Sequence, residues 1–363
     1  MKVLFINSVC GIGSTGRICI KLAQGLEEQG HECRIAYGRK TVPDMYRKFG
    51  IRIGKKINVI LHVLRTRICD EHGFCSKHAT SEFLKWADQF NPDLLWLHNI
   101  HGYYINIEML FRWIKRRPQM QVRWTLHDCW AFTGHCSYFT VDKCDQWKNH
   151  CLHCPQIRRY PASLLISNCE QNFERKQVAF TGVMRMILIT PSQWLAGLVK
   201  QSFLMEYQTE VLHNNVDTSV FKPTPSDFRQ RYGLEGKKII LGVANVWNER
   251  KGIDDFFKLA KSLDDNFRIV MVGLNSLQIR SLLPNMIGIQ KTNSARELAE
   301  IYSAADVFFN PTYEDNYPTV NIEAEACGTK VITYCTGGAP ETIRREDSLV
   351  VPVGYYRWIS ENE

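Results

Sequence analysis

Short apolar stretches alternate with helical patterns along the first half of the chain. Lys2–Asn7 and Cys33–Tyr37 are apolar stretches of strand length, and Arg17–Gln29 between them repeats apolar residues at helical spacing. Leu94–Leu97 and Val122–Leu126 predict further buried strands, each followed by a polar or histidine-bearing loop. This strand–helix–strand alternation predicts an α/β fold with a parallel sheet covered on both faces.

The same alternation starts again after about residue 190. Strands are predicted at Lys238–Val243, Arg268–Val272, Val307–Asn310 and Lys330–Tyr334, and helices at Gly252–Ser262, Arg296–Ser303 and Thr319–Cys327. Two successive α/β halves predict two Rossmann-like domains facing a central cleft, with ligands at the carboxyl ends of the strands. We place them at 1–190 and 191–345, with the boundary between 190 and 215 and a C-terminal tail at 346–363.

Two segments depart from this alternation, a predicted helix in Asp44–Lys56 and a Cys-rich insertion at 129–160. The length of 363 residues exceeds what one ordinary core supports, and 45% hydrophobic with 23% charged residues is typical of a soluble globular protein. The apolar runs Ile57–Leu64 and Val183–Ile189 are too short to span a bilayer. Because the chain opens on a strand and not on a leader-like segment, we expect a cytoplasmic protein.

Positive charge is concentrated in the first half. Residues 1–190 carry 27 Lys and Arg against 15 Asp and Glu, a net charge of +12, whereas the whole chain carries +8. A basic half indicates an anionic partner, which could be a membrane surface, a lipid phosphate or a nucleic acid. A well-solvated surface would explain the same excess.

A glycine-rich turn, Gly11–Gly16, lies between the first strand and the first helix. Its glycines allow close approach of a ligand, and the helix N-terminus attracts an anion. The spacing matches the dinucleotide fingerprint, but the acidic residue that should close the second strand is missing after Tyr37. Arg39 would suit a 2′-phosphate, so an NADP-dependent reductase is an alternative, and a turn without a ligand is the simpler explanation.

An acidic loop and a helix follow the strand Val307–Asn310. Pro318 stands where the helix begins, so the helix N–H groups at 319–321 point toward the carboxyl ends of the strands. A nucleotide diphosphate is the expected ligand of such a helix N-terminus. The acidic residues around it, among them Glu323, are available for sugar or ribose hydroxyls.

The segment Tyr313–Gly328 resembles the acidic signature of glycosyltransferase family 4, the retaining nucleotide-sugar transferases of GT-B fold. That signature has two glutamates separated by seven residues, and Asp315 and Glu323 occupy these positions, with Asp in place of the first Glu. The Cys-rich insertion, His98 and His101 resemble those of capsule- and colanic-acid-type enzymes within the family. Other matching blocks are Leu212–Asp217 with Phe221, Asn248–Gly252, Ala304–Asp306 and Thr336–Glu341.

The resemblance implies a role for each site residue. Lys251 with Arg250 would hold the diphosphate, Asp315 the donor sugar and Glu323 the ribose hydroxyls. His127 would contact the donor sugar or serve as a base. The implied donor-binding residues are Gly13, Gly16, Arg250, Lys251, Asn293, Asp315, Asn316, Pro318, Thr319, Val320 and Glu323. Because an Asp-x-Asp motif is absent from the sequence, we expect no catalytic metal.

The Cys-rich insertion predicts a metal site. Cys136, Cys144, Cys151 and Cys154 follow the pattern C-x7-C-x6-C-x2-C, and its last pair has the spacing of a zinc knuckle. Four thiolates would close the coordination shell, so the expected zinc is structural. Free buried thiols and an iron–sulfur cluster remain as alternatives.

The expected partners follow from the same resemblance. The donor would be UDP- or GDP-linked, and His98 and His101 would bind an acceptor saccharide on a polyprenyl diphosphate, at the inner face of the cytoplasmic membrane. Residues 346–363 are shorter than the crossover segment usual in the family and would represent a truncated form of it. A basic nucleic-acid-binding protein is a further alternative, but it leaves the acidic segment without a role, so no nucleic acid partner is expected.

Overall fold

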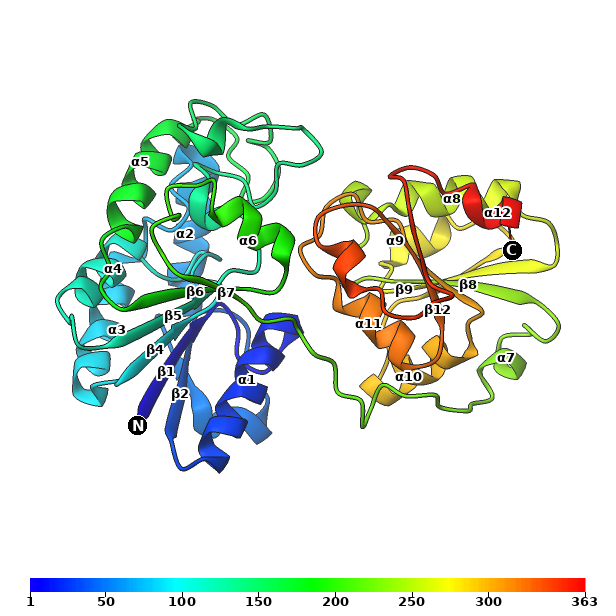
Figure 1. The fold of residues 1–363 in the computed structure, drawn as a ribbon, viewed down its shortest axis with the longest axis horizontal. Coiled ribbons are helices and arrows are strands. Elements are labelled where there is room, and N and C mark those ends of the chain that lie inside the picture. The colour runs from blue at the N-terminus through cyan, green and yellow to red at the C-terminus, as the bar shows by residue number, and fades with distance from the viewer. Residues whose placement is uncertain (363) are drawn as a thin grey trace. The chain divides into compact units, whose positions relative to one another are not determined.

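The computed structural model describes residues 1–362, and the chain divides into two compact units, Met1–Leu212 and His213–Glu363 (Figure 1). This division lies inside the 190–215 range in which the sequence places the domain boundary. Each unit contains one sheet whose neighbouring strands all run parallel. The predicted α/β class with two Rossmann-like units is thereby confirmed.

Unit 1 is built on a seven-stranded sheet of order β3-β2-β1-β4-β5-β6-β7. Its strands are β1 Lys2–Asn7, β2 Glu32–Tyr37, β3 Gly50–Arg52, β4 Leu94–Leu97, β5 Gln121–Thr125, β6 Met186–Thr190 and β7 Thr209–Val211. Strand β1 pairs with β2 on one side and with β4 on the other, so the strand order reverses at β1. The carboxyl ends of β1 and β4 therefore lie at the topological switch point, where ligands bind in such sheets.

Helices cover both faces of this sheet (Figure 1). They are α1 Gly13–Glu28, η1 Asp44–Phe49, α2 Lys56–Cys69, α3 Lys77–Phe90, α4 Ile107–Lys115, η2 Trp130–Phe132, η3 Gln146–Lys148, α5 Cys169–Phe180 and α6 Gln193–Val199. Side chains of β1 alternate between two cores: Val3 and Phe5 pack with α1, whereas Leu4 and Ile6 pack with α3, α4 and α5.

The predicted helix in Asp44–Lys56 is wrong over most of its length. The chain forms the short 3-10 turn η1 and then the edge strand β3, which pairs with β2 from Ile35↔Gly50 to Tyr37↔Arg52. The open edge of β2 offers backbone hydrogen bonds that local helical spacing does not reveal. Gly54, with a φ of +65°, then turns the chain into α2.

Unit 2 contains a six-stranded sheet of order β10-β9-β8-β11-β12-β13. Its strands are β8 Lys238–Val243, β9 Phe267–Val272, β10 Met286–Ile289, β11 Val307–Asn310, β12 Lys330–Tyr334 and β13 Leu349–Val351. Its helices are α7 Phe228–Arg231, η4 Glu249–Lys251, α8 Ile253–Ser262, α9 Ser276–Arg280, α10 Ala295–Ala304, α11 Thr319–Ala326, η5 Ala339–Thr342 and α12 Trp358–Asn362. Part of the predicted tail belongs to this unit, because β13 pairs with β12 and Ile359 is fully buried.

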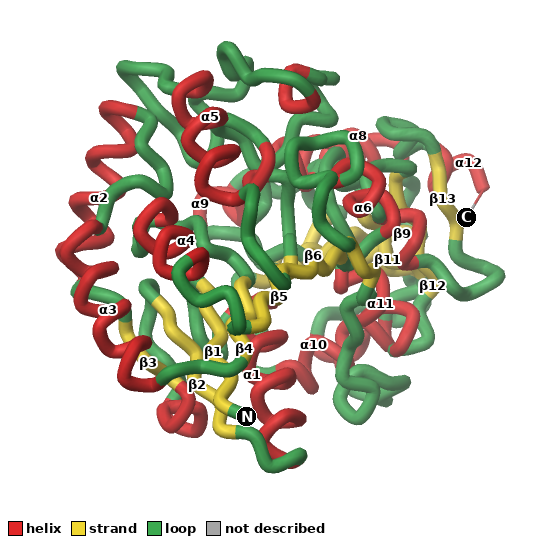
Figure 2. Tube along the Cα trace, turned by 60° about the vertical axis from the view of Figure 1, so that its left-hand side comes forward, coloured by secondary structure: helices red, strands yellow, loops and turns green. Residues whose placement is uncertain are grey.

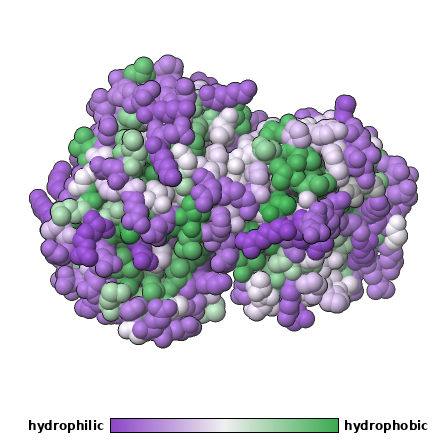
Figure 3. Space-filling view, in the orientation of Figure 1, coloured by the Kyte–Doolittle hydropathy of each residue, from purple (hydrophilic) through white to green (hydrophobic). Residues whose placement is uncertain are grey.

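Figure 2 shows helices beside the strands in both units. Buried side chains fill the space between helices and sheets. The face of the molecule seen in Figure 3 is largely hydrophilic, with apolar residues showing between the polar ones. Among the helices of residues 1–362, none combines the length and the apolarity needed to cross a bilayer.

Candidate active site

Lys251 and Asp315 form an ion pair at the carboxyl ends of β8 and β11. Lys251 ends the turn η4 after β8, and Asp315 lies in the loop between β11 and α11. The Nζ of Lys251 contacts the Oδ2 of Asp315, and their side chains are 20% and 16% exposed. Burial opposes ionisation of Asp315, but the charges of Lys251 and Arg250 outweigh it and hold the pKa of this carboxyl below its ordinary value. The sequence-predicted diphosphate and sugar residues therefore meet as a charged pair.

The loop that carries Asp315 is held from two sides. The Nη1 of Arg250 donates to the carbonyl of Glu314 at 2.6 Å, and the backbone N–H of Tyr313 donates to the carbonyl of Arg250 at 2.8 Å. On the other side, Gly337 has a φ of +54°, and a Cβ there would lie 1.9 Å from the carbonyl oxygen of Asp315. Only glycine allows this close approach, so the Gly337 turn fixes the position of the acid.

Helix α11 begins directly after this loop, as predicted. Pro318 is its N-cap residue, and no described side chain caps the helix. The N–H of Asn321 donates to the carbonyl of Pro318 at 3.2 Å, whereas its side chain accepts from Asn310 at 2.8 Å and donates to Thr342 at 2.9 Å. These contacts anchor the first turn, and they leave Thr319 and Val320 as the N–H groups closest to the helix start.

Glu323 lies in the middle of α11 with 9% of its surface exposed. The hydroxyl of Tyr302, a fully buried residue of α10, donates to the Oε2 of Glu323 at 3.1 Å. This contact holds the carboxylate in one orientation. Tyr302 is thus a positioning residue that the sequence did not reveal, because its helical spacing marks it only as a core side chain.

The remaining predicted donor residues of unit 2 differ in their surroundings. Asn316 is 2% exposed, and its N–H donates to the Oδ1 of Asp315 at 2.9 Å. Val320 packs against the core on the α10–α11 side of the sheet. Asn293 is exposed, and its backbone N–H and its side chain donate to the Oε2 of Glu297 at 2.6 and 3.1 Å. These contacts of Asn293 belong to the start of α10 and not to the Lys251–Asp315 pair.

The three predicted histidines of unit 1 gather after β4 and β5. The Nδ1 of His98 and the Nε2 of His127 lie 3.0 Å apart, with their rings stacked at 5.3 Å. Burial lowers the pKa of His127 to about 4 and that of His98 well below its ordinary value, so both rings are neutral at neutral pH. His101 lies between the Oδ2 of Asp128 at 3.1 Å and the hydroxyl of Tyr160 at 3.0 Å.

The glycine turn of unit 1 combines a packing glycine with an open one. A Cβ on Gly16 would lie 3.1 Å from Val9, and its carbonyl accepts from the N–H of Gly11, so this residue closes the turn. Gly13 starts α1 with a φ of +65° and has open space around its Cβ position. Arg39, the residue on which the reductase alternative depends, faces the ring of Tyr103 at 5.8 Å.

Sulfur atoms of the Cys-rich insertion gather around a residue outside it. Cys154 shares side-chain hydrogen bonds with Cys136 and with Cys169, and Cys151 shares one with Cys169. Cys144 accepts instead from the backbone of Gln146. Three of the four predicted ligands thus lie together, with Cys169 at the start of α5 as the fourth sulfur.

A compact group of potential ligand atoms, all within 4.8 Å of one another, is formed by His150, Glu170 and Glu174 in the described chain. Exposed acidic groups of this kind are common without an ion, and this group is separate from the predicted cysteine set.

Two structural features of unit 2 have no signal in the sequence. Asp255 is 1% exposed and accepts hydrogen bonds from the hydroxyls of Tyr313 and Tyr334 at 2.8 and 2.7 Å. Asp255 therefore links Tyr313, the first residue of the acidic segment, to Tyr334 at the end of β12. Gly337 was recognisable as part of a glycine turn, but its contact partner, the backbone of Asp315, was not.

The chain is similar to known proteins in sequence and in fold. Residues 226–356 match the family model of glycosyl transferases group 1. Over 363 aligned residues, the chain is 24% identical to a protein of Escherichia coli K12 named for colanic acid biosynthesis, glycosyl transferase WcaC, covering 97% of this chain and 87% of that protein.

Solved structures show the same fold over both units. Sucrose-phosphate synthase from Thermosynechococcus elongatus aligns with a TM-score of 0.70 and 16% identity, covering 99% of this chain and 88% of that one. Anabaena HepE in complex with UDP and glucose aligns with a TM-score of 0.65 and 14% identity over the same shares. The chain thus has the GT-B fold, its residues 226–356 match the group 1 glycosyl transferases, and it is similar along almost its whole length to a protein named as a glycosyl transferase.

Proposed function

We propose that the chain transfers a sugar from a UDP- or GDP-linked donor to a saccharide acceptor carried on a polyprenyl diphosphate, in the synthesis of a capsular or exopolysaccharide. The observation that carries this proposal is the Lys251–Asp315 pair beside the start of α11, with Glu323 on the same helix. The name of the colanic acid relative and the complex of HepE with UDP and glucose support it.

The chemistry places negative charge on the leaving group. A glycosidic bond forms between the acceptor oxygen and the anomeric carbon, the bond from that carbon to the diphosphate breaks, and the hydroxyl proton passes to a diphosphate oxygen. Lys251, Arg250 and the first N–H groups of α11 would stabilise the new charge, so we propose that the step needs no metal. Because the proton acceptor is the leaving group on the same face of the sugar, the configuration would be retained.

The donor and acceptor contacts follow from the same arrangement. Glu323, held by Tyr302, would accept hydrogen bonds from the ribose hydroxyls, and Asp315 would bind the donor sugar. In unit 1, the contact between the neutral rings of His98 and His127 uses one nitrogen of each, so the pair would offer one donor and one acceptor nitrogen to sugar hydroxyls. His101 is oriented by Asp128 and adds a third polar group to the acceptor side.

A screen of purified nucleotide sugars tests this proposal. One UDP- or GDP-linked sugar is expected to raise the melting temperature of the protein and to release its nucleotide when a lipid-linked or soluble saccharide acceptor is added. The variant Glu323→Gln should weaken donor binding about 10- to 100-fold, because a carboxylate that accepts two hydrogen bonds is replaced by a neutral amide.

Glu325→Gln is the matched control, since Glu325 lies on the same helix but accepts from the backbone of Arg344 and Arg345. It should bind the donor within about threefold of the wild type. Donor binding by Glu323→Gln equal to that of the control, or binding of NADPH in place of every nucleotide sugar, would contradict the proposal.

We also propose that Cys136, Cys151, Cys154 and Cys169 hold a structural zinc ion. Three of these side chains belong to the predicted set, and the sulfur contacts replace Cys144 by Cys169. Four thiolates on the insertion and on α5 would fix these two segments to one another when a metal is bound.

Elemental analysis of the purified protein should find about one zinc per chain, a ratio expected for a closed four-thiolate site. Cys169→Ser is expected to lose the metal and to lower the melting temperature, whereas Cys144→Ser should keep both. Retention of metal by Cys169→Ser together with its loss from Cys144→Ser would restore the ligand set predicted from the sequence. Absence of metal from the purified wild-type protein would contradict the proposed zinc site.

A further inference from the structure

The two fully buried residues of helix α2 are polar, whereas its most exposed side is apolar. His62 and Thr66 are 1% and 0% exposed, and Asp70, directly after the helix, is also fully buried. His62 accepts from the N–H of Gly73 at 3.1 Å, and its Nδ1 lies 2.9 Å from the hydroxyl oxygen of Ser76. Within the helix, the hydroxyl of Thr66 donates to the carbonyl of His62 at 2.9 Å. The buried side of the helix is therefore bound to unit 1 through hydrogen bonds.

The opposite side of α2 is a continuous apolar stripe. Its members follow helical spacing and are 46–56% exposed: Ile57, Ile60, Leu61, Leu64 and Ile68. An ordinary surface helix turns such a stripe toward the core, whereas Figure 2 shows α2 at the outer edge of unit 1. This is the apolar stretch of the sequence that was too short to span a bilayer.

A neighbouring loop extends the stripe. The N–H groups of Leu164 and Ile166 donate to the carbonyls of Arg67 and Ile68 at 2.8 and 3.2 Å, so the loop lies against the end of α2. Leu164, Leu165 and Ile166 are 61%, 76% and 47% exposed. These three residues and the five of the helix are called the α2 surface below.

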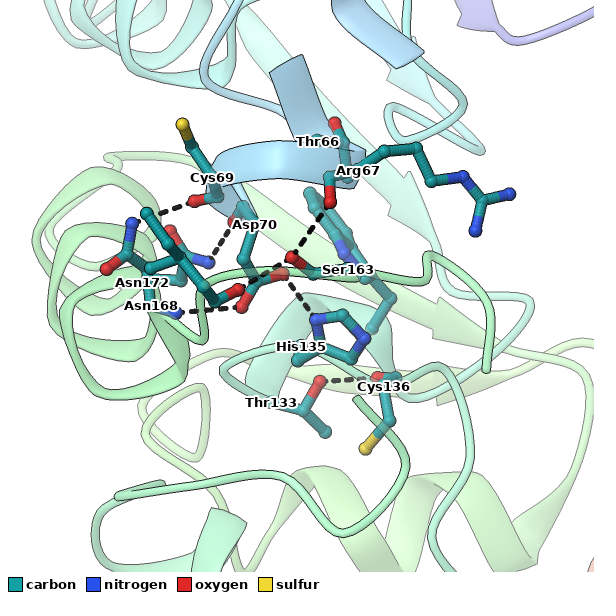
Figure 4. A network of polar contacts seen from close by, with 12 residues as sticks. Thr66, Arg67, Cys69, Asp70, Thr133, His135, Cys136, Ser163, Asn168 and Asn172 are labelled. Atoms are coloured by element: carbon teal, nitrogen blue, oxygen red, sulfur yellow. Dashed lines mark hydrogen bonds and ion pairs between the residues drawn. The ribbon is translucent and has the colours of Figure 1, made fainter. Parts of the chain in front are cut away.

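Buried polar contacts hold the two parts of the α2 surface together (Figure 4). Asp70 contacts the Nδ1 of His135 at 2.5 Å and accepts from the backbone N–H of Asn168 at 3.1 Å. Asn168 also donates to the carbonyl of Cys69 at 2.8 Å, and Asn172 donates to the carbonyl of Asp70 at 2.5 Å. The helix end and the loop are thus fixed relative to one another with their apolar side chains outward.

Basic residues border the α2 surface. Lys55 and Lys56 precede the helix and are exposed, Arg67 is half-buried near its end, and Arg158 is exposed before the loop. Arg65 is paired with Glu71 at 2.8 Å. An apolar patch of this kind with a basic border matches the surface of a bilayer that contains anionic lipids. Two copies of the chain joined through this surface would instead bring the same positive charges together.

We infer that the α2 surface docks the protein on an anionic lipid bilayer, with the apolar stripe in the interface and the basic border on the headgroups. Only the purpose of this docking rests on the proposed function: at the bilayer the protein would meet its lipid-linked acceptor. Binding to vesicles needs neither donor nor acceptor, so the two proposals fail separately.

Co-sedimentation of the full chain with vesicles tests the inference. The wild type should bind vesicles containing phosphatidylglycerol more tightly than pure phosphatidylcholine vesicles, and salt should weaken the binding. The variant Leu61→Gln/Leu64→Gln should bind about tenfold more weakly to both, because two apolar side chains are lost from the interface. Lys55→Gln/Lys56→Gln should lose about tenfold only on the anionic vesicles.

Val178→Gln/Met205→Gln is the matched control, because these apolar side chains of unit 1 are 74% and 68% exposed but lie outside the α2 surface. It should bind vesicles as the wild type does, and all variants should keep the wild-type melting temperature. If the leucine variant does not fold, Ile57→Gln/Ile60→Gln takes its place. Unchanged vesicle binding by the folded α2 variant would overturn the inference. It would also be overturned if the wild-type protein were a dimer and the α2 substitutions only converted it into monomers.

Discussion

Replacing Lys251 by alanine is expected to lower kcat/KM for the nucleotide sugar about 100- to 1000-fold. Lys251 forms an ion pair with Asp315, and it lies two residues before the start of α8 with only 20% of its side chain exposed. A fixed cation in such a site stabilises the leaving diphosphate without reorganisation, so its loss falls on the transition state. The measurement is the initial rate of nucleotide release at donor concentrations below KM.

Asp315→Asn separates the two partners of the ion pair. If Lys251 binds the diphosphate and Asp315 the sugar, this variant should keep the affinity for free UDP or GDP within about threefold but lose transfer. Lys251→Ala should lose both. Lys261→Ala, an exposed lysine of the neighbouring α8, is the control and should behave as the wild type. Equal nucleotide affinity in Lys251→Ala and the control would show that the diphosphate is bound elsewhere.

The substitution Gly337→Ala is expected to destabilise unit 2 and to weaken donor binding together. A Cβ at this position would overlap the carbonyl oxygen of Asp315 at 1.9 Å, in a backbone conformation with a φ of +54°. The conformation costs about 1 kcal/mol for alanine, and the overlap forces a backbone shift that costs roughly a further 1–3 kcal/mol. Because the shift moves Asp315 itself, donor binding should weaken together with the melting temperature of the protein.

Gly354→Ala provides the matched control. Gly354 also has a positive φ, +84°, but no atom lies within 4 Å of its Cβ position. It should therefore show only the conformational cost of about 1 kcal/mol and normal donor binding. Thermal unfolding followed by circular dichroism and titration with the nucleotide give both quantities, and similar losses in the two variants would mean that the contact with Asp315 is unimportant.

Both predictions concern a loop whose geometry is determined by residues far away in the sequence. Asp315 depends on Lys251 for its charge partner and on Gly337 for its backbone position. Asp255 adds a third constraint, since it accepts hydrogen bonds from the hydroxyls of Tyr313 and Tyr334. The acidic segment is therefore held by contacts from three other parts of unit 2, as the proposed stabilisation of charge would require.

Much of the fold could be predicted from local patterns. Lys2–Asn7, Leu94–Leu97 and Val307–Asn310 are strands with the predicted bounds, because a continuous apolar run bounded by polar residues is compatible with a buried parallel strand and little else. The start of α11 at Thr319 was predicted for an equally local reason, the proline that precedes it. The seven-residue separation of Asp315 and Glu323 identified the class of enzyme, because the spacing is set within one loop and one helix turn.

Other features were decided by contacts between distant segments. Residues 50–52, which were predicted as part of a helix, form β3 because they pair with the edge of β2. Tyr302, on a neighbouring helix, holds the carboxylate of Glu323 through a hydrogen bond. Cys169, 15 residues beyond the last predicted ligand, contacts Cys151 and Cys154, whereas the sequence had grouped Cys144 with them.

The clearest case is α2. Periodicity shows that one side of a helix is apolar, but it does not show whether that side meets the core or the solvent. In unit 1, His62, Thr66 and Asp70 at one side of α2 are buried and hydrogen-bonded, whereas the apolar side of the helix is exposed to solvent. The sequence by itself determined the strands with continuous apolar runs, the domain order and the acidic motif, because these depend on neighbours along the chain. The tertiary structure alone decided which faces were buried and which side chains met, because burial and hydrogen bonding depend on the complete set of packed elements.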